Sequence, residues 1–298
     1  MDPGGALKRT FALLLAAWAC GCASGGQVDI ATLTSSSDEI VWEAGQKAFA
    51  GKHWEPARRY FKRIIDGFPQ SQYGPSARLA LADSHFNEGS ITNYILAISE
   101  YRDFVTLYPS HPRSDYAQFQ IGEAQFSQRN GPDRDQTATV KALAEFDRLL
   151  EFYPSSSYVE QARSRIGACR QSLARAEFLA GFFYQRTRRA YRAAAIRYEG
   201  LMSDYPDYDS MDEVLYRLGQ VLYLSGRAAE ALPQLSKLLE VYPTSPWAND
   251  ARALMEQAAK APPPTRQAAP PPPLPSPAPD TEPGTPPSPV PATPEGGP

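Results

Sequence analysis

The sequence predicts an all-α fold: a superhelical solenoid of about five helix hairpins, followed by a C-terminal helix. First, an aromatic residue followed by proline recurs five times, at Pro69, Pro109, Pro154, Pro206 and Pro243. Second, a helical apolar stripe precedes each pair and another helical pattern follows it. Proline lacks an N–H group and disfavours α geometry in the residue before it, so each pair is expected to end a helix. Serine, aspartate or asparagine residues are then expected to cap the next helix.

The second helix of each hairpin is predicted from the residues eight, five, four and one positions before the proline. All are apolar or aromatic, and their spacing places them on one face of an α-helix. Because no hairpin buries such a stripe alone, the units are expected to stack. The sets are Phe61, Ile64, Ile65 and Phe68; Tyr101, Phe104, Val105 and Tyr108; Phe146, Leu149, Leu150 and Tyr153; Tyr198, Leu201, Met202 and Tyr205; and Leu235, Leu238, Leu239 and Tyr242.

Small residues recur at fixed positions in both helices of each hairpin. An alanine stands twelve positions before each proline, and a second small residue stands thirteen positions after it, on the first helix of the next unit. Such side chains allow a neighbouring helix to approach closely. The alanines are Ala57, Ala97, Ala142, Ala194 and Ala231, and the second set is Gly45 (in the first unit), Ala82, Gly122, Gly167 and Gly219.

The N-terminus is predicted to be a lipoprotein signal peptide, residues 1–21. Two basic residues precede an apolar stretch at 11–19 that is too short to cross a membrane. The stretch ends in Ala-Cys-Gly-Cys, which resembles a bacterial lipobox, in which a cysteine becomes lipidated. Cys22 is favoured because all three residues before it are small, and Cys20 is the alternative. A disulfide or a metal site is less favoured, since the two cysteines are only two positions apart and no Cys/His pair at zinc spacing accompanies them.

The remaining segments are assigned from composition. Residues 22–37 are predicted to be a flexible tether and residues 38–260 the repeat domain. Residues 261–298 hold 17 of the 29 prolines and few larger aliphatic residues, which predicts a disordered proline-rich tail. No aspartate follows either cysteine to suggest retention at the inner membrane. The predicted location is therefore the outer membrane, with a lipid anchor on its periplasmic face.

Each unit has a small residue on its first helix, an alanine and then a large apolar residue on its second helix, and a proline after it. This order resembles the tetratricopeptide repeat across five units. The proline intervals of 40, 45, 52 and 37 residues depart from the usual 34. The 45-residue interval holds a loop at 127–137, and in the next a helix is expected from about Tyr158 to Arg188. LYPSHPRSDYAQF (107–119), DRDQT (133–137) and residues 173–206 are similar to the BamD/ComL family. The resemblance covers the lipobox and all repeats, but not the tail.

This resemblance implies a part of the machinery that inserts β-barrel proteins into the outer membrane. The expected partners are the barrel subunit of that complex, unfolded outer-membrane β-barrel proteins, and the membrane through the lipid anchor. The family is thought to receive the aromatic-ending C-terminal signal of its substrates through its N-terminal repeats. The first helices of the first three units could supply a hydrophobic trough for it, although aromatic stripes at helical spacing are also typical of a core. The trough residues are Trp42, Phe49, Leu79, Phe86, Tyr116, Phe119 and Phe126, whereas the fourth unit offers Gln161, Ser164, Ala168 and Gln171.

Residues 163–197 carry nine arginines and one acid, Glu177, in a chain whose formal net charge is −3. A charge run can be a solvated face, and nucleic acid or anionic lipid would also suit it. A periplasmic lipoprotein meets no genome, so nucleic acid is excluded and an acidic protein surface is the expected partner. The family resemblance implies that Arg197 joins the barrel subunit's periplasmic domain. Arg192, Arg189 and Arg188 are expected to belong to the same surface.

An enzymatic role is not expected. The three histidines are distant in sequence, no motif pairs them with a nucleophile, and there is no glycine-rich phosphate loop or metal spacing. No cofactor and no metal are predicted. Two alternatives remain open: a periplasmic repeat coordinator of the Tol–Pal or cell-division type, and a cell-wall tether that uses the proline-rich tail.

Overall fold

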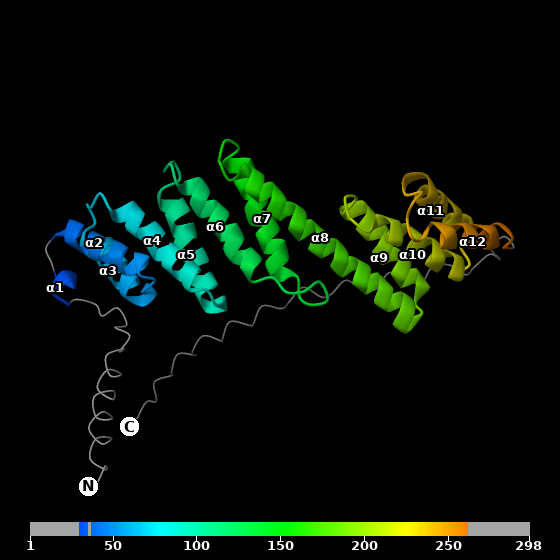
Figure 1. Cartoon of the computed structure of the whole chain (residues 1–298), viewed down its shortest axis with the longest axis horizontal. Helices are drawn as coiled ribbons and strands as arrows, with labels where there is room; N and C mark the ends of the chain where they lie inside the picture. The colour runs from blue at the N-terminus through cyan, green and yellow to red at the C-terminus, as the bar shows by residue number, and fades with distance from the viewer. Residues whose placement is uncertain (1–29, 35–36, 262–298) are drawn as a thin grey trace, which may run out of the picture. The chain divides into compact units, whose positions relative to one another are not determined.

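A computed structural model describes residues 30–34 and 37–261 of the chain (Figure 1). These residues belong to one compact unit that ends at Ala261. The predicted signal peptide, the lipidation site at Cys22 or Cys20, and the proline-rich tail beyond Ala261 lie outside the described residues.

The described residues form helices and contain no strand, as the sequence predicts. Consecutive helices are joined by short connections, except for the longer loop before α7. The helices are α1 (Ile30–Leu33), α2 (Asp38–Ala50), α3 (Trp54–Gly67), α4 (Gly74–Glu88), α5 (Ile91–Leu107), α6 (Ser114–Ser127), α7 (Thr137–Phe152), α8 (Val159–Phe183), the π-helical turn η1 (Tyr184–Arg188), α9 (Tyr191–Asp204), α10 (Met211–Leu224), α11 (Ala228–Val241) and α12 (Ala248–Ala259).

The helices from α2 to α11 form five antiparallel hairpins, and α12 follows as the C-terminal helix. Each helix packs mainly against the helix before it and the helix after it along the chain, as the order of colours in Figure 1 shows. We call the first helix of each hairpin the A helix (α2, α4, α6, α8, α10, with α12 at the end) and the second the B helix (α3, α5, α7, α9, α11). The predicted solenoid of about five hairpins is confirmed.

The apolar stripe of every B helix is buried as its spacing predicts. In all five hairpins the residues eight and five positions before the proline are fully buried, and so is the alanine twelve positions before it. The residues four and one positions before the proline are partly buried at the edge of the same cores. The stripe therefore supplies the cores between successive units and is not available to a ligand.

Four of the hairpins have a glycine on the A helix directly under a large residue of the B helix. A Cβ atom at Gly45 would lie 2.7 Å from the Phe61 ring, and one at Gly122 would lie 2.5 Å from the Phe146 ring. In the same way, a Cβ atom at Gly219 would lie 2.6 Å from the side chain of Leu235. Real Cβ atoms do not approach so closely, so these positions exclude every larger residue unless the helices move apart.

The prediction that Gly167 is the small residue under the B helix of the fourth hairpin is wrong. Gly167 is exposed, and a Cβ atom there would meet nothing within 4 Å. Gly181 takes the role instead, since a Cβ atom there would lie 2.6 Å from the Tyr198 ring. The physical reason is the length of α8, which has 25 residues. Its first half buries Cys169 in the core shared with α7, and its second half buries Phe178 in the core shared with α9.

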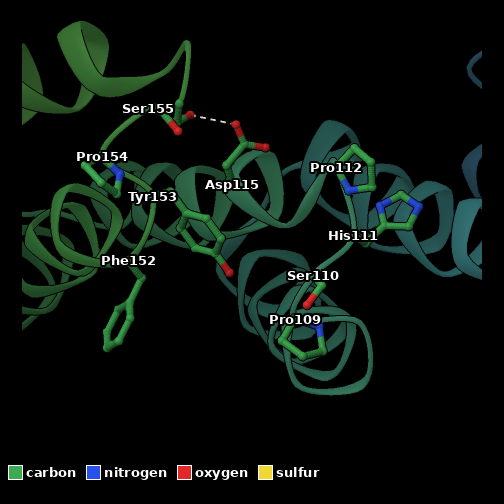
Figure 2. A pocket seen from close by; sticks show the side chains of 10 residues that line it. Pro109, Ser110, His111, Pro112, Asp115, Phe152, Tyr153, Pro154 and Ser155 are labelled. Atoms are coloured by element: carbon green, nitrogen blue, oxygen red, sulfur yellow. Dashed lines mark hydrogen bonds between the residues drawn. The ribbon is translucent and has the colours of Figure 1, made fainter.

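The aromatic-proline junctions contain a recurring contact that braces neighbouring A helices. At the third junction, Ser156 Oγ donates to Asp115 Oδ2 at 2.7 Å and accepts from the Tyr158 N–H at 3.1 Å. Tyr158 then stacks on Phe119 with 5.0 Å between ring centroids. Figure 2 shows this junction, where the dashed hydrogen bond ends on Asp115. The prediction that serine, aspartate or asparagine caps the next helix is wrong at all five junctions, where α4, α6, α8, α10 and α12 begin with no side-chain cap. At this junction the reason is that Ser156 lies two residues before the N-cap position, Tyr158, and bonds Asp115 of α6.

The same brace occurs at two further junctions, in alternate positions along the stack. Ser71 donates to Asp38 at 2.6 Å while Tyr73 stacks on Trp42 at 5.4 Å, and Ser245 donates to Asp212 at 2.6 Å while Trp247 stacks on Tyr216 at 5.0 Å. The braces therefore join α2 to α4, α6 to α8, and α10 to α12.

Within the described ranges, no helix has the length and apolar content needed to cross a membrane.

Candidate protein-binding surfaces

Three of the seven residues predicted to line a peptide trough are buried in cores. Leu79 is 1% exposed, Phe126 is 7% exposed and Phe119 is 8% exposed. Leu79 packs in the core of α4, α5 and α6, and the two phenylalanines pack in the core of α6, α7 and α8. Their main role is therefore packing.

The other four predicted trough residues are partly exposed, and each is held by a neighbouring ring or by a hydrogen bond. Trp42 stacks on Tyr73, Phe49 meets Trp54 edge-on at 5.3 Å, and Phe86 meets Tyr94 at 5.6 Å. The fourth, Tyr116, donates its hydroxyl to Asp83. These side chains expose edges on α2, α4 and α6, so a trough at these positions is shallower than the sequence suggests and stays a prediction.

A hollow of about 450 Å³ lies on the A helices between α6 and α8. Arg165 and Glu123 form a two-point ion pair across it, with nitrogen–oxygen distances of 2.6 and 3.0 Å. Two of the polar residues expected in the fourth unit line this hollow, whereas Gln171 binds the α9–α10 loop through Asp207 and Asp209. The lining residues are Phe119, Glu123, Glu160, Gln161, Ser164 and Arg165.

A partly buried carboxylate connects helices α4, α5 and α6. Asp83 on α4 accepts hydrogen bonds from the hydroxyl groups of Tyr101 on α5, at 2.5 Å, and Tyr116 on α6, at 2.8 Å. Burial raises the pKa of Asp83 above its ordinary value of 3.8, although the two tyrosine hydrogen bonds and the charge of Arg113 act in the opposite direction. This network could not be predicted from the sequence, because an acidic residue on an A helix carries no signal that tyrosines from two other helices converge on it.

Most arginines of α8 and η1 lie on aromatic rings. A guanidinium group on a ring keeps its N–H edges available to an acceptor, because the ring occupies only one of its faces. The five contacts, measured from the guanidinium carbon to the ring centroid, are Arg165 to Phe126 (4.7 Å), Arg170 to Tyr205 (5.6 Å), Arg175 to Phe178 (4.9 Å), Arg186 to Phe182 (5.8 Å) and Arg188 to Phe183 (5.6 Å).

The four arginines predicted to dock a partner are exposed between the end of η1 and the middle of α9. Arg197 pairs with Glu177 of α8 at 3.1 Å, and both side chains are more than a third exposed. Arg189 adopts the left-handed conformation, with φ of 50°, and ends the π-helical turn that begins at Tyr184. Arg189 and Arg192 line a second hollow of about 450 Å³. The structure therefore brings Arg189 and Arg192 together at one hollow, and a docking surface shared by all four arginines stays a prediction.

Two exposed apolar residues accompany these arginines and were not identified from the sequence. Phe183 is 46% exposed at the end of α8, and Ile196 is 68% exposed on α9. Ile196 stands two positions after Ala194, which is fully buried, and so faces away from the core. That spacing was a signal in the sequence, but it becomes informative only when α9 is known to have an uncovered outer face.

A third hollow, of about 310 Å³, lies between the aromatic-proline loops of the second and third hairpins (Figure 2). Loop 109–112 supplies two prolines and His111, and loop 152–156 supplies the exposed ring of Phe152. The His111 Nδ1 atom accepts from the Arg113 N–H at 3.1 Å, so this imidazole supports its own loop.

The family of the chain follows from comparison with known proteins. The model of the YfiO family, described as an outer membrane lipoprotein, matches residues 35–226. The chain belongs to this family. A tetratricopeptide-repeat model matches residues 213–245, which cover α10 and α11. The family and the repeat type expected from the sequence are confirmed.

Relatives of this lipoprotein family member share about a quarter of its sequence. It is 26% identical over 244 residues to the outer membrane protein assembly factor BamD of Caulobacter vibrioides, covering 82% of this chain and 79% of the relative. It is 25% identical to BamD of Haemophilus influenzae, covering 76% and 87%. Among solved structures, it is similar to the crystal structure of MamA protein, with 18% identity, coverage of 68% and 90%, and a TM-score of 0.31.

The chemically reactive side chains of this family member have structural partners. His85 is buried beside Asn93, and burial lowers its pKa. Burial raises the pKa of the Cys169 thiol to about 11, so the thiol stays protonated near neutral pH. In the part of the chain that the structure describes, no group of three or more His, Cys, Asp and Glu side chains is placed to hold a metal ion.

We predict that Asp83 makes the fold less stable as the pH rises. Because the folded-state pKa of Asp83 lies above its ordinary value, the folded chain binds this proton more tightly than the unfolded chain. The free energy of unfolding should fall as the pH rises from 3.8 to the folded-state pKa and then stay level. Urea denaturation at a series of pH values should show that the free energy of unfolding declines less for Asp83→Asn than for the unchanged chain. Identical pH profiles for Asp83→Asn and the unchanged chain would contradict this account. The control is Lys237→Gln, at an exposed position of α11.

Proposed function

We propose that this chain is a lipid-anchored, non-catalytic scaffold of the machinery that assembles β-barrel proteins in the outer membrane. Membership of an outer membrane lipoprotein family supports this function, and so do relatives named as assembly factors. A stack of helix hairpins offers extended surfaces for holding other proteins. Lipidation at Cys22, or at Cys20, holds the scaffold to the periplasmic face of the membrane.

The observation that supports the proposal most is the exposure of four arginines within ten residues at the end of η1 and along α9: Arg188, Arg189, Arg192 and Arg197. Arg197 and Glu177 form a partly exposed pair, and such pairs contribute about 0–1 kcal/mol to stability. Arg197 can therefore exchange Glu177 for a carboxylate of a partner at little cost to the fold. The partner is the periplasmic domain of the barrel subunit.

The A helices of the first three hairpins receive the aromatic-ending C-terminal signals of unfolded outer-membrane proteins. The partly exposed rings of Trp42, Phe49, Phe86 and Tyr116 provide contacts for such a segment, and the hollow between α6 and α8 continues the same series of helices. Glu123 and Arg165 already pair across that hollow, so it accepts an uncharged side chain more readily than a terminal carboxylate.

We predict that Arg197→Glu abolishes co-purification of the barrel subunit from detergent-solubilised membranes. The substitution places two carboxylates together and reverses the charge of the docking surface. Glu177→Gln is the matched control: it breaks the same internal pair but leaves Arg197 positive, and it should retain the barrel subunit. Equal recovery with Arg197→Glu would refute the docking assignment. Recovery of Tol–Pal components by the unchanged chain would favour the alternative periplasmic coordinator.

We predict that a photo-crosslinking residue at Ser164 captures a peptide ending in phenylalanine. Ser164 of α8 lines the hollow that α8 shares with α6, the A helix of the third hairpin, whereas Val241 is exposed at the end of α11 and serves as the control position. Mass spectrometry should find the crosslink at position 164 and a much weaker one at 241. The crosslink should weaken when the terminal phenylalanine is replaced by aspartate. Equal yields at both positions would show that the A helices do not receive the peptide.

A further inference from the structure

The outer face of α9 exposes a large aliphatic side chain that contributes nothing to the core. Ile196 is 68% exposed, whereas Ala194, Tyr198 and Leu201 of the same helix are fully buried. In the described part of the chain, only Ile91 among the large hydrophobic residues is as exposed as Ile196. Ile196 stands one turn after Arg192 on α9, so it lies beside one of the predicted docking arginines.

Small residues flank Ile196 along the same face of the helix. Ala193 stands one turn before it, and Gly200 stands one turn after it. A Cβ atom at Gly200 would meet nothing within 4 Å, so this glycine serves no contact inside the fold. Glycine inside a helix is less favourable than most residues by roughly 1 kcal/mol or less, and no packing of the chain itself explains that cost. The low surface beside Ile196 lets the backbone of another protein approach α9 closely.

A hollow opens one turn before Ile196, where α9 begins. Its volume is about 450 Å³, and it is lined by Arg189, Ala190, Tyr191, Arg192, Ala193 and Ser225. The alanines and the tyrosine ring give it apolar walls, and the two arginines bring positive charge to its edge. Leu224, which precedes Ser225 at the end of α10, is also exposed. Apolar and cationic groups from two hairpins therefore meet at this point.

We propose that the outer face of α9 is the apolar centre of the docking surface. The partner inserts one apolar side chain into the hollow and packs its backbone against Ile196 and Gly200, while its carboxylates face Arg189 and Arg192. An apolar centre surrounded by charged groups is the usual composition of a specific protein interface. The inference rests on the proposed function and deepens it. The barrel subunit's periplasmic domain is recognised by an apolar side chain flanked by carboxylates, and not by charge alone.

A protein surface fits these observations better than a lipid surface. The hollow is confined to six residues at the start of α9 and the end of α10, and the low face of α9 suits another backbone. A membrane would instead require a broad apolar face with basic residues along its border. Charge complementarity explains the arginines for either partner, but only a protein explains the hollow and Gly200 together.

The decisive variant is Gly200→Gln. A side chain at position 200 extends into open space in the free chain, and glutamine favours helix more than glycine does, so the melting temperature should rise by a few degrees. The same side chain should block a partner that packs on α9 and weaken binding at least about tenfold. Gly167→Gln on α8 is the matched control, because its Cβ atom also meets nothing within 4 Å. It should raise the melting temperature without affecting binding.

A second pair of variants separates apolar contact from charge. Ile196→Ser should weaken binding about tenfold in low and in high salt, since the contact it removes is not screened. Ile91→Ser removes an equally exposed isoleucine from α5 and should leave binding unchanged. The measurement is calorimetric titration of the full-length chain in detergent with the purified periplasmic domain of the barrel subunit.

The outcomes distinguish the inference from the function on which it rests. Unchanged affinity of both Gly200→Gln and Ile196→Ser, with tight binding by the unchanged chain, would overturn the inference and leave the proposed function standing. No binding by the unchanged chain would overturn both. If the two variants instead lost binding to phosphatidylglycerol-containing vesicles while keeping the periplasmic domain, α9 would be a membrane contact and the inference would be wrong.

Discussion

The close approach of each A helix to its B helix is the constraint on which the rest of the structure depends. A glycine or alanine on one helix lies under a large side chain on the other, as Gly122 lies under Phe146 and Gly181 under Tyr198. Interiors are packed at crystal-like density, so these contacts fix the separation of the two helices within a fraction of an ångström. The B-helix stripes can then be buried between successive hairpins. Without this spacing, the next hairpin would have no matching surface on which to stack.

Successive hairpins are connected by two kinds of polar contact. The serine–aspartate hydrogen bond with its stacked aromatic pair joins α2 to α4, α6 to α8 and α10 to α12. Between these pairs, Asp83 joins α4 to α6 through Tyr116, and Gln185 in the π-helical turn connects Tyr198 to Gln220 of α10, with hydrogen bonds of 2.9 and 2.5 Å. The A helices are therefore held at every junction. The outer faces of the B helices, including that of α9, are left available to other proteins.

The repeat was predictable because the residue types that recur in it each have a known physical effect on the backbone or on packing. An aromatic-proline pair followed by polar residues ended each B helix, although a proline alone does not decide this, since Pro233 lies inside α11. An apolar stripe at helical spacing is buried wherever units stack. The position of Gly181 was not predictable, because counting from Pro154 leads to Gly167 unless the length of α8 is known. Ser156 fits a capping pattern equally well, and only the fold shows that Asp115 lies within its reach. For the binding surfaces, the arginines were visible as a charge run. The burial of Phe119 and the exposure of Ile196 depend on which side of each helix is covered, and one sequence does not specify that.

The most direct test of the packing constraint is the free energy of unfolding of Gly122→Ala compared with that of Gly167→Ala. Alanine favours helix over glycine by about 1 kcal/mol, so Gly167→Ala should be stabilised by up to that amount. Gly122→Ala should be destabilised by about 1–3 kcal/mol, because its methyl group meets the Phe146 ring at 2.5 Å. Adding Phe146→Leu should then cost less in the Gly122→Ala background than in the unchanged chain. Stabilisation by both alanine substitutions would contradict the account, since it would mean that α6 and α7 are not in close contact at this position.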